Sequence, residues 1–341
     1  MSWLKLVEVL WEVTSKCDKG CEYCGSKDIL NSKDCSGDEL KNVANQLVDY
    51  KVDEVTLTGG EPGMLAEEDP GLFGDIVDIL HDGGIEVKVV SYGKVFQAPI
   101  RDIISWDKIS VVGMSINTKG DIDYLNSLDF PVEEHTMITN FGRHNIWDFA
   151  SLAEAATGFK CWQVQLTMGH EQLNADGVEH LRNQLVNSDA SKDTTIVIAD
   201  NLQACHRCMA GIRSCGITYN GDVMACLSER SFAKYRSYGN LLNTDLKDIW
   251  ENEFKDIRFS GSRKCCRDFI DYPDPKSNQP EMPPIIITHE GEENQNKNKY
   301  PRPNNWGPSV VLYGVSPGLG DGDKQVIVYG AYTWDGTYTS P

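Results

Sequence analysis

Three cysteines stand on eight residues near the start of the chain, in the stretch CDKGCEYC. Cys17, Cys21 and Cys24 are separated by three residues and then by two. Structural zinc takes four protein ligands, and an ordinary iron-sulfur cube takes four cysteines. The nearest further thiol is Cys35, and the nearest histidine is far away in the sequence. A cube held by three cysteines leaves one iron open to a substrate or cofactor, and the spacing predicts this chemistry.

A second segment of chemical interest is TLTGGEP, which places Gly59, Gly60, Glu61 and Pro62 after a strand-like run. Glycines allow backbone polar groups to approach a ligand closely, and a carboxylate can oppose an ammonium group. Other polar residues stand at the ends of later strand-like runs. They are Ser91, Ser115, Asn117, Asn140 and Gln165. All of these residues are candidates for ligand contacts.

The elements that position these residues can be read from the pattern of the chain. The N-terminal stretch WLKLVEVLWEVT reads as a first strand. Further β-branched runs, each expected to be a strand, occupy residues 53–59, 85–93, 108–117, 132–140 and 162–168. Helical patterns fill most gaps, the clearest after a Ser36-x-x-Glu39 capping box. Alternating strands and helices predict an α/β fold with parallel β/α units, and ligands gather at the carboxyl ends of such strands.

The pattern divides the chain into three parts. We expect a core barrel over residues 1–200 and a small cysteine-rich module over residues 201–270. Within that module, the Asn220-Gly221 turn predicts a β-hairpin. Residues 271–341 read as a Pro-rich linker followed by a terminal β-hairpin of unknown role.

Composition limits the class of protein. The apolar fraction is 40%, and no run approaches the roughly 18 apolar residues that span a membrane. Glu8 and Glu12 interrupt any signal-peptide region, and eleven cysteines without an export signal favour a reducing compartment. We therefore expect a soluble, cytoplasmic protein. The net charge of −19 would repel a phosphate backbone, which argues against a nucleic-acid partner.

The cysteine triplet, with Tyr23 before its last member, resembles the signature of the radical S-adenosylmethionine (SAM) superfamily. The glycine-rich segment after the second strand strengthens the resemblance. It implies a partial (β/α)6 barrel, a 4Fe-4S cluster on Cys17, Cys21 and Cys24, and SAM on the open iron. The segment from Gly59 to Pro62 would lie along the methionine part of SAM. By the same resemblance, the strand-end residues Ser91, Ser115 and Asn117 would line its ribose and carboxylate, with Asn140 a weaker candidate. The alternative that these are ordinary turn-forming residues stays open.

The later cysteines resemble the SPASM/Twitch extension of radical SAM enzymes. Its Cys-x-Ala-Gly segment and Asn-Gly-Asp turn match Cys208 to Gly211 and residues 220–222. The resemblance implies one auxiliary 4Fe-4S cluster rather than two. The preferred ligand set consists of Cys205, Cys208, Cys226 and one of Cys265 or Cys266. A zinc ribbon is the alternative that the Cys-x-x-Cys spacing permits.

The resemblance implies an enzyme in which a 5'-deoxyadenosyl radical takes a hydrogen atom from substrate. We expect a ribosomally made peptide as substrate, which the enzyme would cross-link, epimerise or oxidise. A small-molecule dehydrogenase or isomerase acting on a sugar, aminoglycoside or nucleoside is the second reading. Hypermodification of a nucleotide or nucleic acid is a third, which the acidity disfavours, and a zinc-stabilised binding module without enzymatic activity is a fourth. A reductant such as flavodoxin or ferredoxin would supply the electron. The first strand begins within a few residues of Met1, so leader recognition would need a separate partner protein or the C-terminal tail.

Overall fold

The structure is a computed structural model, and it describes residues 5–97, 99–128, 134–167, 171–192, 194–199, 210–228, 236–259 and 327–328. Its strands are β1 (Glu8–Thr14), β2 (Glu54–Gly59), β3 (Glu86–Ser91), β4 (Val111–Ser115), β5 (Thr136–Phe141), β6 (Cys161–Leu166), β7 (Thr195–Ile198), β8 (Ser214–Ile217), β9 (Asp222–Met224), β10 (Gly239–Asn240) and β11 (Ile327–Val328). Its α-helices are α1 (Gly37–Tyr50), α2 (Pro62–Glu68), α3 (Pro70–Asp82), α4 (Lys119–Leu125), α5 (Phe149–Ala156), α6 (Ala175–Val186), α7 (Leu246–Asp248) and α8 (Lys255–Phe259).

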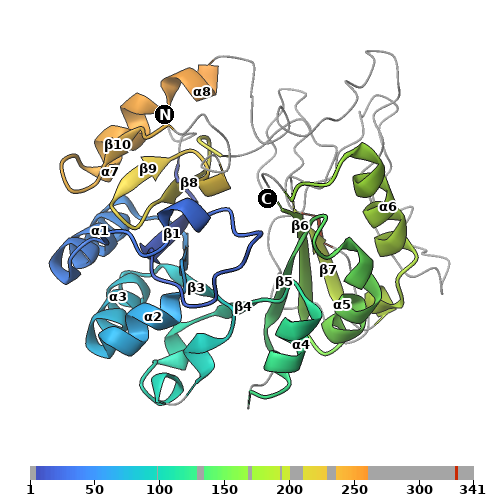
Figure 1. Ribbon diagram of the computed structural model, residues 1–341. Coiled ribbons are helices and arrows are strands. Elements are labelled where there is room, and N and C mark those ends of the chain that lie inside the picture. Colours follow the sequence, from blue (N-terminus) through green and yellow to red (C-terminus); the bar gives the residue numbers. More distant parts are fainter. Residues whose placement is uncertain are drawn as a thin grey trace, which may run out of the picture.

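The strands form one sheet in the order β10-β9-β8-β1-β2-β3-β4-β5-β6-β7-β11, counted over the described residues. Strands β1 to β7 are all parallel to their neighbours. Figure 1 shows the strands in an arc with the helices outside it. The predicted α/β fold with parallel β/α units is confirmed, and the carboxyl ends of β1 to β6 lie along one edge.

The two faces of the sheet differ because the strands alternate in polarity. On β2, Val55 and Leu57 are fully buried, whereas Thr56 and Thr58 are partly exposed. The buried side chains share one core with the apolar side of α1, including Leu47. A parallel sheet is ordinarily covered on both faces, so the partly exposed polar face inside the arc indicates space for a ligand.

Helix α1 begins as its capping box predicts. The backbone N–H of Ser36 donates to Glu39 Oε2 (2.7 Å), and the Glu39 N–H donates back to Ser36 Oγ (3.4 Å). Helix α3 extends over Pro70–Asp82, and Gly84 follows it with a φ of +82°. No described helix has the length and apolar character needed to cross a lipid bilayer.

The predicted hairpin around Asn220-Gly221 is present as β8 and β9. What the sequence did not indicate is that β8 pairs in parallel with β1, from Glu8 opposite Ser214 to Trp11 opposite Ile217. The cysteine-rich region therefore continues the barrel sheet instead of standing apart from it. Of the predicted terminal hairpin, only β11 is described, and it lies parallel to β7; the rest falls outside the described residues.

Candidate active site

The three cysteines lie on the loop that leaves the carboxyl end of β1. Asp34 fastens the base of this loop, because its carboxylate accepts hydrogen bonds from Thr14 Oγ1 (2.5 Å) and from the backbone N–H (2.8 Å) and Oγ (2.6 Å) of Ser15. Further along, the Cys24 N–H donates to the Cys21 carbonyl (3.2 Å), which closes a tight turn between these two residues. The loop is thus held at a strand end, where parallel α/β folds bind ligands.

The thiols of this loop are partly buried and lie among backbone N–H groups. Burial raises the pKa of Cys17 and of Cys24, and Cys21 lies close enough to both to add to that effect. Backbone N–H groups act in the opposite direction, from Lys19 and Gly20 on Cys17 and from Ser26 on Cys24 (3.4 Å). N–H groups that point at sulfur stabilise the ligand form of a cysteine and tune a bound cluster.

The described ranges contain no group of three or more His, Cys, Asp or Glu side chains that could hold a single metal ion. The fit of an iron-sulfur cube is therefore judged from the donor set of the loop. Cys17, Cys21 and Cys24 are all free and partly exposed, and they stand on one loop among backbone donors. This donor set fits a cube with one open corner.

The glycine-rich segment lies directly against the base of the cysteine loop. Gly60 N–H donates to the Thr14 carbonyl and Glu61 N–H donates to the Lys16 carbonyl, each at 2.8 Å. Gly59 has a φ of +140°, and a Cβ on Gly60 would overlap the carbonyl oxygen of Lys16. Both glycines are thus required by the approach of two backbone segments, in addition to any contact with a ligand.

We expect Gly60→Ala to destabilise the full-length protein by about 1–3 kcal/mol, because the added methyl group must displace the loop base. The displaced loop should also retain less iron after reconstitution. Urea unfolding and iron analysis measure the two effects. Gly74→Ala on α3 is the matched control, because a Cβ at this position meets no atom within 4 Å. This variant should stabilise the protein by up to about 1 kcal/mol, since alanine favours a helix over glycine. Equal stability of the two variants would contradict the packing argument.

Glu61 is fully buried and organises the end of β3. Its carboxylate accepts hydrogen bonds from Ser91 Oγ (2.6 Å), Tyr92 N–H (3.0 Å) and Gly63 N–H (3.0 Å). The last of these caps α2, in which Pro62 takes the first position that suits proline. Burial raises the pKa of Glu61 to about 7, and the three hydrogen bonds act against this rise. Glu61 and Ser91, two residues predicted to contact a ligand, are therefore hydrogen-bonded to each other.

Removing this carboxylate should leave three donors without an acceptor in a buried place. We expect Glu61→Ala to lower the free energy of unfolding by about 3 kcal/mol or more, measured in urea. Glu154→Ala on the exposed side of α5 is the control, with an expected change within about 0.5 kcal/mol. A Glu61→Ala protein as stable as this control would show that the network carries no stability.

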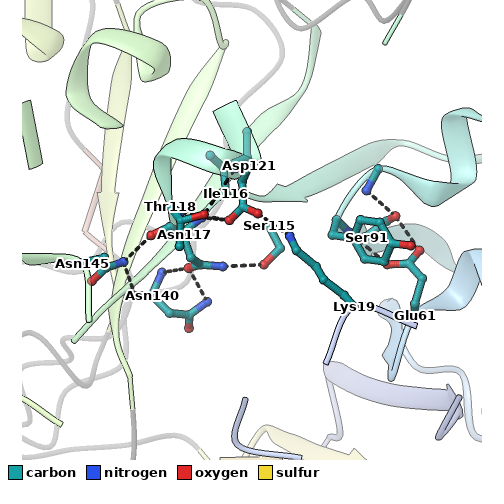
Figure 2. Close-up of polar contacts among 12 residues, drawn as sticks. Lys19, Glu61, Ser91, Ser115, Ile116, Asn117, Thr118, Asp121, Asn140 and Asn145 are labelled. Carbon is teal, nitrogen blue, oxygen red and sulfur yellow. Dashed lines mark hydrogen bonds and ion pairs between the residues drawn. The ribbon is translucent and has the colours of Figure 1, made fainter. Parts of the chain in front are cut away.

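A second polar group joins the carboxyl ends of β4, β5 and β6. Asn117 Nδ2 donates to Ser115 Oγ (3.0 Å), and Asn117 Oδ1 accepts the N–H of Asn140 (2.6 Å). Asn140 Oδ1 in turn accepts from Gln165 Nε2 (2.7 Å). Asn145 donates to the carbonyls of Asn117 (2.8 Å) and Asn140 (3.0 Å) (Figure 2). The structure thus brings together the predicted residues Ser115, Asn117 and Asn140; their contacts with SAM stay a prediction.

The cysteine loop makes further contacts through Tyr23, which the sequence analysis selected, and through Lys19, which it did not. Tyr23 stacks on His144, with ring centroids 4.1 Å apart and 10° between the planes. Lys19 Nζ donates to Asp121 Oδ1 (2.5 Å), beside the Asn117 turn. One sequence signal was available, because Thr118-x-x-Asp121 has the form of a capping box, which α4 indeed shows. Nothing in the sequence pointed to His144.

Of the predicted auxiliary-cluster ligands, the structure describes Cys226, two residues after β9. Cys205, Cys208, Cys265 and Cys266 lie outside the described residues. Met224 pairs with Gly216, which in turn pairs with Leu10, so β9 ends beside the first half of β1 and runs away from the strand end that carries the cysteine loop. The four residues from Leu10 to Thr14 span about 13 Å along β1.

Residues 199–268 match the SPASM family, an iron-sulfur cluster-binding domain. No curated protein sequence matches the chain. Among solved structures, Streptococcus suis SuiB bound to precursor peptide SuiA is similar with a TM-score of 0.58 and 13% identity, over 76% of this chain and 67% of SuiB. SuiB bound to S-adenosylmethionine gives a TM-score of 0.56 at 14% identity, over 76% and 68%.

A further structure, native anSMEcpe with bound AdoMet and a Cp18Cys peptide, gives a TM-score of 0.54 at 12% identity, over 73% of this chain and 81% of that one. At these identities the likeness concerns the fold. The predictions of a partial barrel of parallel β/α units and of an iron-sulfur cluster-binding domain after it are confirmed.

Proposed function

We propose that this chain, which combines the radical SAM fold with a SPASM cluster-binding domain, is an enzyme that cleaves SAM reductively and modifies a peptide. The observation that carries the proposal is the three-cysteine loop at the carboxyl end of β1. This loop lies beside the buried hydrogen bonds of Glu61 and the hydrogen-bonded side chains of Asn117 and Asn140. When bound, the cluster and SAM supply a 5'-deoxyadenosyl radical that takes a hydrogen atom from the substrate.

The residues of this chain would hold and orient the reactants. Cys17, Cys21 and Cys24 would bind the SAM-binding 4Fe-4S cluster as thiolates. The segment from Gly59 to Pro62 would lie along the methionine part of SAM. Ser91, Ser115, Asn117 and Asn140 would orient its ribose and carboxylate. The protein's part is placement and the exclusion of water, since the radical attacks whatever lies nearest.

We assign residues 1–200 to the barrel, 201–270 to the auxiliary-cluster module and 271–341 to the tail. Cys226, together with Cys205, Cys208 and one of Cys265 or Cys266, would hold a second 4Fe-4S cluster. Because β9 leads toward Cys226 and away from the carboxyl end of β1, the second cluster would stand apart from the cysteine loop, with the substrate between them. This placement suits a second cluster that serves the substrate rather than SAM.

A peptide substrate is favoured over a small molecule by the similar structures. SuiB was solved with precursor peptide SuiA, and anSMEcpe was solved with a peptide and AdoMet. Oxidation, cross-linking or epimerisation of a residue all begin with hydrogen abstraction. The reductive cleavage of SAM needs an electron, and we propose a reductant such as flavodoxin or ferredoxin as the partner that supplies it. For peptide recognition we propose a separate leader-binding protein or the C-terminal tail.

Anaerobic reconstitution tests the enzyme assignment. The full-length protein should bind about eight irons for two cubes, and mass spectrometry should detect 5'-deoxyadenosine after reduction with dithionite in the presence of SAM. A colourless protein that binds only zinc would refute the assignment.

A second experiment tests the substrate class. The loaded enzyme is offered a defined set of short synthetic peptides in one arm and a set of sugars, aminoglycosides and nucleosides in the other. Stimulation of 5'-deoxyadenosine formation by peptides, with a mass change in the peptide, supports the proposal. Stimulation only in the other arm would favour the small-molecule dehydrogenase or isomerase.

A further inference from the structure

The cysteine loop is attached on two sides by the two charged residues between Cys17 and Gly20. Asp18 reaches the end of β3, where its carboxylate accepts from Tyr92 Oη (2.6 Å) and Lys94 Nζ (3.0 Å). Lys19 reaches Asp121 on α4 (2.5 Å). Figure 2 shows Lys19 extending between the Ser91–Glu61 group and the Asp121 group. The loop therefore spans the distance between β3 and β4.

The Lys19–Asp121 ion pair is largely removed from solvent. The Lys19 side chain is 24% exposed and that of Asp121 is 8% exposed. The Lys19 ammonium also lies 4.9 Å from the centre of the Tyr92 ring, a favourable position for a cation. Partly buried charge pairs are screened less than exposed ones, and removing one partner is costly. The contact is thus stronger than an ordinary surface ion pair.

The same carboxylate shapes the turn that follows β4. Asp121 Oδ2 accepts the backbone N–H groups of Asn117 (2.8 Å) and Thr118 (2.9 Å), while Oδ1 accepts Lys19. Asn117 continues the chain of contacts to Ser115 and Asn140. A shift of Lys19 would therefore act on the residues that orient the ribose.

We infer that Lys19 is a positioning residue, which holds the cluster-binding loop and the Asn117 turn as one unit through Asp121. One consequence of the inference rests on the proposed function. It is that the loop cysteines and the residues expected to contact the ribose keep their relative positions when SAM binds. The contact itself joins residues 102 positions apart and belongs to the protein whether or not a cluster is bound.

The first test uses hydrogen-deuterium exchange on the full-length protein without metal. In Lys19→Met, the amides of residues 17–24 and of Asn117 and Thr118 should exchange several-fold faster than in the wild type. Lys19→Arg, which keeps the charge, should restore most of the protection. Lys41→Met removes an exposed ion pair with Asp75 and should leave both segments unchanged. Exchange in Lys19→Met equal to that in the wild type would overturn the inference, whatever the enzyme does.

The second test measures SAM affinity by calorimetry on reconstituted protein. Lys19→Met should weaken SAM binding at least about tenfold, as loss of an outer-shell partner does in metal sites. Asp121→Asn should weaken it as well, and the double variant should be no worse than the more affected single variant. Fully additive losses would show that Lys19 does not act through Asp121. Failure of the wild type to bind SAM would instead count against the proposed function, and the exchange experiment would still decide the inference.

Discussion

Cys24→Ala is expected to reduce 5'-deoxyadenosine formation to background and to remove about four of about eight irons from the reconstituted protein. Cys24 closes the tight turn with Cys21, and its sulfur faces the Ser26 N–H. Two remaining thiols on a partly exposed loop cannot hold a cube against solvent. Iron analysis and mass spectrometry after dithionite reduction with SAM measure both losses.

Cys35→Ala provides the control for this loss of a thiol. Cys35 is the nearest cysteine outside the loop. Its backbone N–H donates a hydrogen bond to the Tyr219 carbonyl (2.9 Å). The variant should keep its iron and its SAM cleavage. Undiminished 5'-deoxyadenosine from Cys24→Ala would remove the basis of the proposed function.

Cys226→Ala is expected to lose about four irons while continuing to cleave SAM, with loss of peptide modification. The reason is position, because Cys226 follows the end of β9, which lies level with Leu10, about 13 Å along β1 from the strand end that carries the cysteine loop. The hydrogen bonds that hold the cysteine loop are made with Asp34, Tyr92 and Asp121, and none of them involves Cys226. The measurement is the amount of 5'-deoxyadenosine per modified peptide, which should rise steeply in this variant.

The matched control is Cys215→Ala, a buried thiol on β8 that packs in the core. It should bind the full amount of iron, with a modest loss of stability. If Cys226→Ala lost SAM cleavage as completely as Cys24→Ala, the second cluster would not be separable from the first. The module would then be structural, or the proposed division of roles would be wrong.

Much of the fold was predictable because it depends on local pattern. The alternation of β-branched residues placed β2 to β6 within a few residues of their observed bounds, and the capping box placed the start of α1. The triplet spacing and TLTGGEP also indicated the radical SAM fold. Local sequence was insufficient for α2, because the helix begins at Pro62 only through a cap by Glu61, whose other partners, Ser91 and Tyr92, are about 30 residues away.

The sequence by itself determined the proposed chemistry and the order of strands and helices, since residue types and their spacing indicate the candidate cluster donors and the alternation of elements. Only the tertiary structure decided which of the candidate residues meet. Ser91 donates a hydrogen bond to Glu61, and β8 pairs in parallel with β1. Tyr23 stacks on His144, and Lys19 forms an ion pair with Asp121. These contacts join segments 30 to about 200 residues apart. They depend on strand order and register, which arise from packing the whole sheet and which no local pattern specifies.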